Sequence, residues 1–186
     1  MELIDRWIFR IADFSVNNNP HSPSRDSIIF VFRLLALIVL TTLITLLACG
    51  ITGHLYEGFL IVGATILIKI FIGSLHFRSI VLCTIVSSIS MIALAFLPKS
   101  HSPLIMYILS GIAIVLIYIY APKNIVVFMR LRQDQIPHLK WVAILLVVLN
   151  LFLQIPLFID AFLFHVISIT PIFEYLFRLI ERRTST

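Results

Sequence analysis

The chain has few charged residues. Only 12% of its 186 residues are Asp, Glu, Lys or Arg, whereas 60% are hydrophobic and the mean hydropathy is +1.08. A soluble globular domain carries about twice this share of charge, because its surface must be solvated. The composition therefore excludes an ordinary soluble protein and indicates an integral membrane protein, for which we expect no nucleic-acid partner.

Cysteine is also rare, and several motifs of intramembrane enzymes are missing. Cys49 and Cys83 fall within or beside hydrophobic runs, and their spacing does not suggest a disulfide framework. The chain has no His-Glu-x-x-His for zinc and no Gly-x-Gly-Asp of an aspartyl protease. The nearest match to the Gly-x-Ser-Gly of a rhomboid-type serine protease, LSGI around Ser110, lacks the first glycine. Cysteine chemistry remains, and we expect no metal and no cofactor.

The N-terminal segment MELIDRWIFRIADFS alternates charged and apolar residues. It is therefore not expected to be a cleavable signal peptide, which needs an unbroken apolar core. Residues 1–16 are instead predicted to form an amphipathic helix on the membrane surface. Its apolar stripe consists of Leu3, Trp7, Ile11 and Phe14.

Six hydrophobic runs follow a polar break at residues 17–26. Each run is near the roughly 20 residues that cross about 30 Å of hydrocarbon. The last two cannot form one helix, because such a rod would exceed the bilayer, so a turn is required near Asp160, and Pro156 is expected to kink the fifth span. The predicted fold is all-α, a single six-helix transmembrane bundle over residues 1–186. The spans are placed at 27–48, 56–72, 79–97, 103–121, 141–158 and 161–177.

Basic residues predict the orientation. With the N-terminus inside, thirteen of the fourteen Lys and Arg residues lie on the cytoplasmic side, and only Lys99 lies outside. Both termini are then cytoplasmic, and the protein is expected in a cell membrane that it crosses several times. The junction between the second and third spans also lies on the cytoplasmic side.

That junction carries the segment GSLHFRSIVLCT, residues 73–84. His76 and Cys83 are seven residues apart, which returns them almost to the same face of a helix. A continuous helix would separate their Cα atoms by about 10.5 Å, beyond the reach of a base to its nucleophile. The two side chains can meet only if the chain bends before the helix, as Gly73 and Ser74 allow.

If the third span starts near Arg78 or Ser79, Cys83 lies close to the positive end of its helix. That end, Arg78 and a nearby imidazole would favour the thiolate, as a Cys/His peptidase requires. Spacing alone leaves a plainer interpretation open, in which the cysteine is a packing residue and the histidine an interfacial polar group. Metal binding is less favoured, because two ligands do not make a site.

The pattern resembles the accessory gene regulator B peptidases, polytopic proteins of about this length. In that family a basic residue and a glycine pair precede a His, and the catalytic Cys follows the His by seven residues. The loop YAPKNIVVFMRLRQDQIPHLK also resembles the family's Ala-Pro start and basic stretch. Three positions depart from the pattern: Lys69 for an arginine, Ser74 for the second glycine, and Phe77 for a small residue.

The resemblance implies a peptidase that matures the precursor of a cyclic autoinducing peptide in quorum sensing. Cys83 would attack a backbone carbonyl of the precursor with His76 as base, and a precursor thiol could then close a thiolactone. The implied partners are a short amphipathic precursor with an acidic C-terminal tail, membrane lipids and a second copy of the chain. Candidates for contacting substrate, forming an oxyanion hole or positioning are Lys69, Gly73, Ser74, Arg78, Ser79, Arg130 and Arg132.

Two other classes of function stay open. A small transporter or exporter would use polar residues in the spans and would not need the thiol of Cys83. A non-catalytic membrane scaffold would recruit a peptide through its basic loops and would also tolerate loss of the thiol. Candidates for a third catalytic residue are Ser79, Asn124, Asn150, Gln154 and Asp160, the last of which is predicted on the outer side.

Overall fold

The computed structural model describes residues 2–19, 22–74, 79–97, 100–123 and 136–184. These residues form helices joined by short turns, as predicted. The helices are α1 (Glu2–Asn18), α2 (Arg25–Ile51), α3 (Leu55–Ile72), α4 (Ile80–Ala95), α5 (Pro103–Tyr120), the 3-10 turn η2 (Ile136–His138), α6 (Leu139–Leu153), α7 (Pro156–Ser168) and α8 (Pro171–Thr184).

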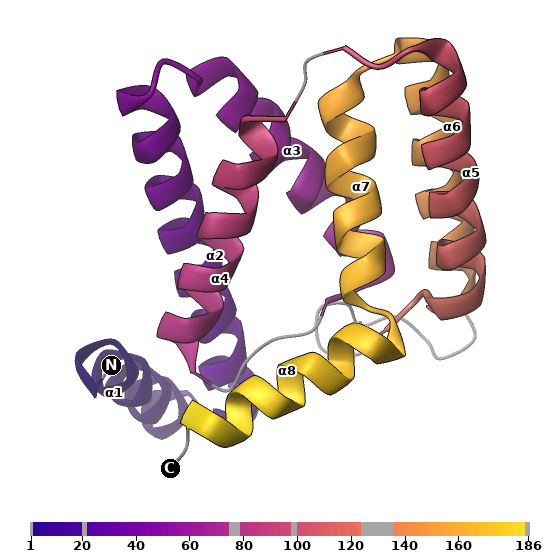
Figure 1. Ribbon diagram of the computed structural model, residues 1–186. Coiled ribbons are helices and arrows are strands. Elements are labelled where there is room, and N and C mark those ends of the chain that lie inside the picture. The colour runs from indigo at the N-terminus through magenta and orange to yellow at the C-terminus, as the bar shows by residue number, and fades with distance from the viewer. Residues whose placement is uncertain (1, 20–21, 75–78, 98–99, 124–135, 185–186) are drawn as a thin grey trace.

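Helices α2 to α7 run alternately up and down a bundle, and α1 and α8 lie across the same end of it (Figure 1). Helix α7 packs against α3 and α5, and α2 packs against α3 and α4. Within the described residues, α2, α3 and α5 are long and apolar enough to cross a membrane. Helices α7 and α8 would count as a fourth candidate if taken together, but a bend of 69° separates them. Helices α4 and α6 are apolar but shorter, at 16 and 15 residues.

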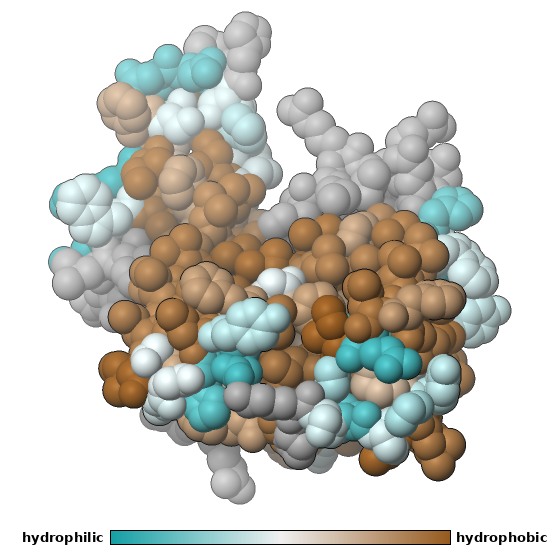
Figure 2. All heavy atoms as spheres, turned by 90° about the horizontal axis from the view of Figure 1, so that it is seen from above, coloured by the Kyte–Doolittle hydropathy of each residue, from teal (hydrophilic) through white to brown (hydrophobic). Residues whose placement is uncertain are grey.

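The outer surface of the bundle is apolar. Only 22% of the most hydrophobic window of α2 is buried inside the protein, and α5 has the same share. Apolar residues cover most of the face seen in Figure 2. A water-exposed surface of this kind would associate or aggregate, whereas hydrocarbon solvates it. The composition and the surface therefore agree on a membrane protein.

Helix α1 has two apolar faces with different roles. Ile8 and Ala12 are buried and pack with residues of α2 and α4. The stripe predicted from the sequence points elsewhere, and Trp7 and Phe14 are 63% and 72% exposed. This open apolar face suits a helix at a lipid surface. An ion pair links α1 to the start of α2, with Arg25 Nε 2.6 Å from Asp13 Oδ1.

The prediction was wrong about where the fifth span ends. Helix α6 stops at Leu153, Gln154 adopts a left-handed conformation with φ 50° and ψ 44°, and α7 begins at Pro156. Proline has no N–H to donate and favours the first turn of a helix, so it starts a new helix here instead of kinking the old one. Asp160, where we expected the turn, lies one turn inside α7.

The predicted sixth span, 161–177, is also not one helix. Helix α7 ends at Ser168, and α8 begins after Ile169 and Thr170, with Pro171 as its first residue. Helix α8 places exposed apolar side chains beside charged ones, as a helix at an interface does. It crosses the end of the bundle next to the region where α3 and α5 end (Figure 1).

Candidate active site

Cys83 lies in the first turn of α4 and is 4% exposed. The side chain of Ser79 caps this helix by accepting a hydrogen bond from Leu82 N, at 3.3 Å. The carbonyl of Ser79 accepts a hydrogen bond from Cys83 N, at 3.0 Å. The sulfur therefore sits on a fixed turn at the positive end of the helix dipole, as the sequence predicted.

The other cysteine has a packing role. Both Cys49 and Cys83 are free thiols. Cys49 is fully buried where α2 crosses α3 at Gly58. A Cβ added at Gly58 would lie 2.9 Å from Cys49 Cβ and 3.1 Å from its Sγ, so the two helices approach closely through these two small residues.

Helix α3 ends at Ile72, and Gly73, which caps it, begins the segment that carries His76. Its φ of 78° is a conformation that other residues rarely adopt, so glycine is required at this turn. The turn is held from the distant loop after α5, because Lys123 N donates to Ile72 O at 2.9 Å and forms a parallel bridge with Gly73. The start of the predicted catalytic segment is therefore fastened on one side by the backbone of residue 123.

Lys69 lies one turn before Gly73, in the last turn of α3. Its side chain is half-buried, and its charge interacts with Cys83 and with His165 of α7. The imidazole of His165 is 2.9 Å from Thr65 Oγ1, and this pair joins α3 to α7 in the middle of the bundle. The arrangement places the side-chain amine of Lys69 near the sulfur, inside the bundle.

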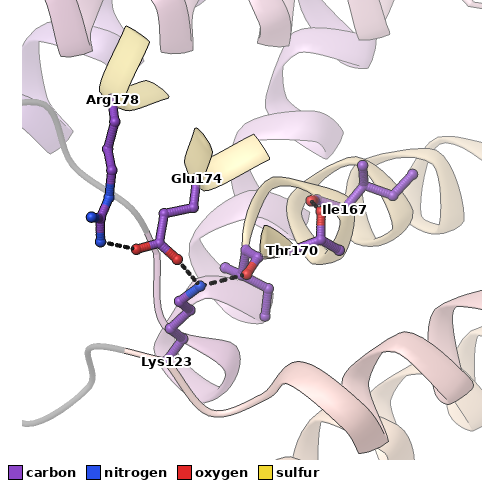
Figure 3. Close-up of polar contacts among 6 residues, drawn as sticks. Lys123, Ile167, Thr170, Glu174 and Arg178 are labelled. Carbon is purple, nitrogen blue, oxygen red and sulfur yellow. Dashed lines mark hydrogen bonds and ion pairs between the residues drawn. The ribbon is translucent and has the colours of Figure 1, made fainter. Parts of the chain in front are cut away.

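The side chain of Lys123 holds α8 against the end of α7 (Figure 3). Its Nζ donates to the carbonyl of Ile169 at 3.0 Å and to Glu174 Oε2 at 2.6 Å. Arg178 donates to the other oxygen of Glu174, Oε1, at 2.6 Å. Hydrogen bonds from Lys123 and then Arg178 lower the pKa of Glu174 below its ordinary value. Lys123 thus connects the end of α3, the end of α7 and α8.

Residues 9–178 match the family model of accessory gene regulator B. The chain belongs to the accessory gene regulator B family. Membership gives it a role in the agr quorum-sensing system, among membrane proteins of a peptidase-like processing type. Searches of the curated proteins and of the solved structures return no significant match.

Four residues singled out from the sequence lie outside the described residues: His76, Arg78, Arg130 and Arg132. The same holds for Asn124, a candidate third catalytic residue. The described members of the accessory gene regulator B motif and the candidate Ser79 gather at the α3–α4 junction. They are Lys69, Gly73, Ser74, Ser79 and Cys83.

The remaining candidates for a third residue have structural roles away from Cys83. Asn150 Nδ2 donates to the carbonyl of Ile155 at 3.1 Å and closes the turn between α6 and α7. Gln154 is exposed in the same turn. Asp160 pairs with His101 Nε2 at 3.0 Å. That pair joins the start of α5 to α7 at the end of the bundle opposite α1 and α8.

The sequence interpretation missed the role of Lys123 and Glu174. Glu174 and Arg178 stand four residues apart, which is a detectable signal for a helix-surface pair. No local signal links Lys123 to Glu174, because 51 residues separate them. Among the described residues, no three His, Cys, Asp or Glu side chains come together as a metal site would need.

Proposed function

We propose that this member of the accessory gene regulator B family is a membrane-embedded cysteine endopeptidase. It removes the C-terminal segment of a short quorum-sensing precursor, with Cys83 as nucleophile and His76 as general base. The observation that carries the proposal is the position of Cys83. The sulfur lies in a capped first helical turn with the Lys69 cation as a neighbour, seven residues after a histidine.

A six-span topology with both termini in the cytoplasm goes with this proposal. Helices α4 and α6 are about 24 and 22 Å long at 1.5 Å per residue, which a bilayer accommodates by thinning locally or with flanking turns. Six alternating helices place α1, α8, Gly73 and Lys123 at one end, which the distribution of basic residues assigns to the cytoplasm. The active site then lies at the cytoplasmic rim of the membrane.

The proposed reaction proceeds by acyl transfer. The Cys83 sulfur attacks a backbone carbonyl of the precursor, and His76 takes the thiol proton and returns it to the departing amine. The acyl part of the precursor then forms a thioester with Cys83. Attack by a thiol of the precursor exchanges one thioester for another and closes a thiolactone ring without ATP. The burial of Cys83 favours this outcome over hydrolysis, because it keeps water away from the thioester.

The proposed partner is an amphipathic precursor with an acidic tail. Apolar residues of such a peptide suit the lipid-facing surface, and its tail suits basic side chains at the cytoplasmic end, such as the largely exposed Arg178. We also propose a homodimer. Gly63 on α3 is an exposed small residue with open space where a Cβ would lie, so another helix could approach closely there.

The three polar residues that a transporter was expected to use, Asn150, Gln154 and Glu57, give little support to that function. The side-chain amide of Asn150 donates a hydrogen bond to Ile155 O in the turn after α6, and Gln154 lies exposed in the same turn. Glu57 is buried beside His54, 3.7 Å away, at the start of α3. These residues sit at helix ends and do not form a path along the bundle.

Co-expression with a candidate precursor tests the proposal. Cys83→Ala, Cys83→Ser and His76→Ala should each stay folded in the membrane and release no C-terminal fragment, as measured by mass spectrometry. Cys49→Ala is the matched control, because it removes the only other thiol and should leave cleavage intact. Full processing by Cys83→Ala would refute the peptidase and favour a scaffold or an exporter.

A further inference from the structure

A cavity of about 240 Å³ lies between α2, α3 and α4. Its wall is largely apolar, with residues such as Ile38, Val62 and Met91. Polar side chains from all three helices interrupt that wall: Thr41, Thr42, Thr65, Lys69 and Ser87. The volume far exceeds that of a single water, so the cavity can admit part of a larger ligand.

The cavity starts next to the proposed nucleophile. Ser87 and Met91 line it, and they follow Cys83 by one and two turns on the same face of α4. Lys69, whose charge interacts with Cys83, lines it from α3. Cys83 itself is not a lining residue, so the cavity extends away from the sulfur along the helices. From Lys69 to Val62 this is about 10 Å of helix.

Thr41 supplies an unused hydrogen-bonding group in this wall. It is 4% exposed, and among the described residues its Oγ1 has no hydrogen-bond partner. A buried hydroxyl without a partner is unfavourable, so a ligand that brings a partner binds more tightly. A lipid acyl chain has no such group along its length, whereas each residue of a peptide carries a carbonyl and almost always an N–H.

We propose that this cavity is the specificity pocket for apolar residues of the substrate on the acyl side of the scissile bond. The inference rests on the proposed function and adds the class of side chain that the enzyme accepts. An apolar residue seated beside Cys83 displaces water from the site and so protects the thioester until a second thiol arrives. Thr41 bonds the peptide backbone, and Lys69 lies near the reacting carbonyl.

Peptide chloromethyl ketones test the pocket without a known precursor. In these reagents a cysteine sulfur displaces chloride and forms a thioether, and the residue next to the ketone takes the place of the acyl-side residue. Rates of labelling at Cys83 are measured by mass spectrometry for acetyl-Leu-Phe-chloromethyl ketone and acetyl-Gly-Gly-chloromethyl ketone. Each rate is divided by that of iodoacetamide, which reports the reactivity of the thiol without filling the cavity.

We expect the protein to prefer the Leu-Phe reagent by about tenfold or more. Ser87→Leu fills the pocket from α4 and should reduce this preference to about one. Thr41→Val keeps the volume and loses the hydroxyl, and should slow the Leu-Phe reagent about fivefold. Ser90→Leu is the control, because Ser90 is half-buried on the same helix, bonds Val86 O at 2.8 Å and does not line the cavity. It should keep the full preference.

Equal rates for the two reagents, a preference that survives in Ser87→Leu, or an unchanged Leu-Phe rate in Thr41→Val would overturn the pocket. A preference that is present in detergent but lost in phosphatidylglycerol vesicles would show that a lipid chain occupies the cavity, and would also overturn it. Failure of the proposed function looks different. In that case Cys83 reacts with neither iodoacetamide nor the ketones, and no precursor is cleaved.

Discussion

Removing the side-chain amine of Lys123 should loosen the end of the bundle that carries the proposed active site. In Lys123→Met the carbonyl of Ile169 loses its donor at 3.0 Å, and Glu174 loses its partner at 2.6 Å. Ile169 is fully buried, so its carbonyl has little access to a replacement partner, and a lost hydrogen bond to a charged group costs about 1.5–3 kcal/mol. The backbone bond from Lys123 N to Ile72 O remains.

Thermal unfolding in detergent measures this loss. At about 2–4 °C per kcal/mol for a chain of this size, Lys123→Met should lower the unfolding temperature by several degrees. Lys140→Met is the control, since the Lys140 ammonium lies over the rings of Tyr118 and Trp141, 4.6 and 5.6 Å from their centroids, and its loss should cost about 1 kcal/mol, less than that of Lys123. Equal unfolding temperatures for the two variants would refute the argument.

Three further predictions use other features of the same molecule. Gly73→Ala forces a side chain into a positive-φ conformation that is essentially confined to glycine, at a cost of about 1–3 kcal/mol, and should reduce precursor cleavage. Gly111→Ala, at an open position of α5, should leave cleavage unchanged, and equal cleavage in the two variants would contradict this. Because the pKa of Glu174 is lowered in the folded protein, its stabilising contribution should be complete above the ordinary pKa of 4.5 and lost as the pH falls through the lower folded pKa. The unfolding temperature measured as a function of pH should show this loss, and Glu174→Gln should not show it. Asn150→Leu removes the donor to Ile155 O and should destabilise the protein by about 1–3 kcal/mol, while precursor cleavage is retained at low temperature. Loss of cleavage in a fully folded variant would instead place Asn150 in the active site.

Most helix positions could be predicted from the sequence, and the errors lie at the turns. Long apolar runs located α2, α3, α4 and α5 to within a few residues, because a run of that length has few other ways to satisfy its backbone. The turn between α6 and α7 was placed six residues late, at Asp160 instead of Gln154. The apolar run continues on both sides of Gln154, so the break depends on Pro156 and on a hydrogen bond from the Asn150 side chain.

The candidate site divides in the same way. The turn that holds Cys83 follows from local residues, since Ser79 caps the helix in which the cysteine lies. The ion pair of Lys123 with Glu174 and that of His101 with Asp160 join residues 51 and 59 positions apart. Such pairs depend on which helices become neighbours, and no local pattern in a single sequence records that.

The sequence by itself determined that this is a helical membrane protein, which of its ends carries the basic residues, and where a cysteine follows a histidine by seven residues. Those properties depend on composition and on spacing along the chain, through the cost of exposing apolar or charged groups to the wrong solvent. Only the tertiary structure decided that Lys69 neighbours Cys83, that Lys123 fastens Gly73 and α8, and that a cavity opens one turn beyond the sulfur. These features arise from side chains of different helices, and their positions are fixed when the helices pack.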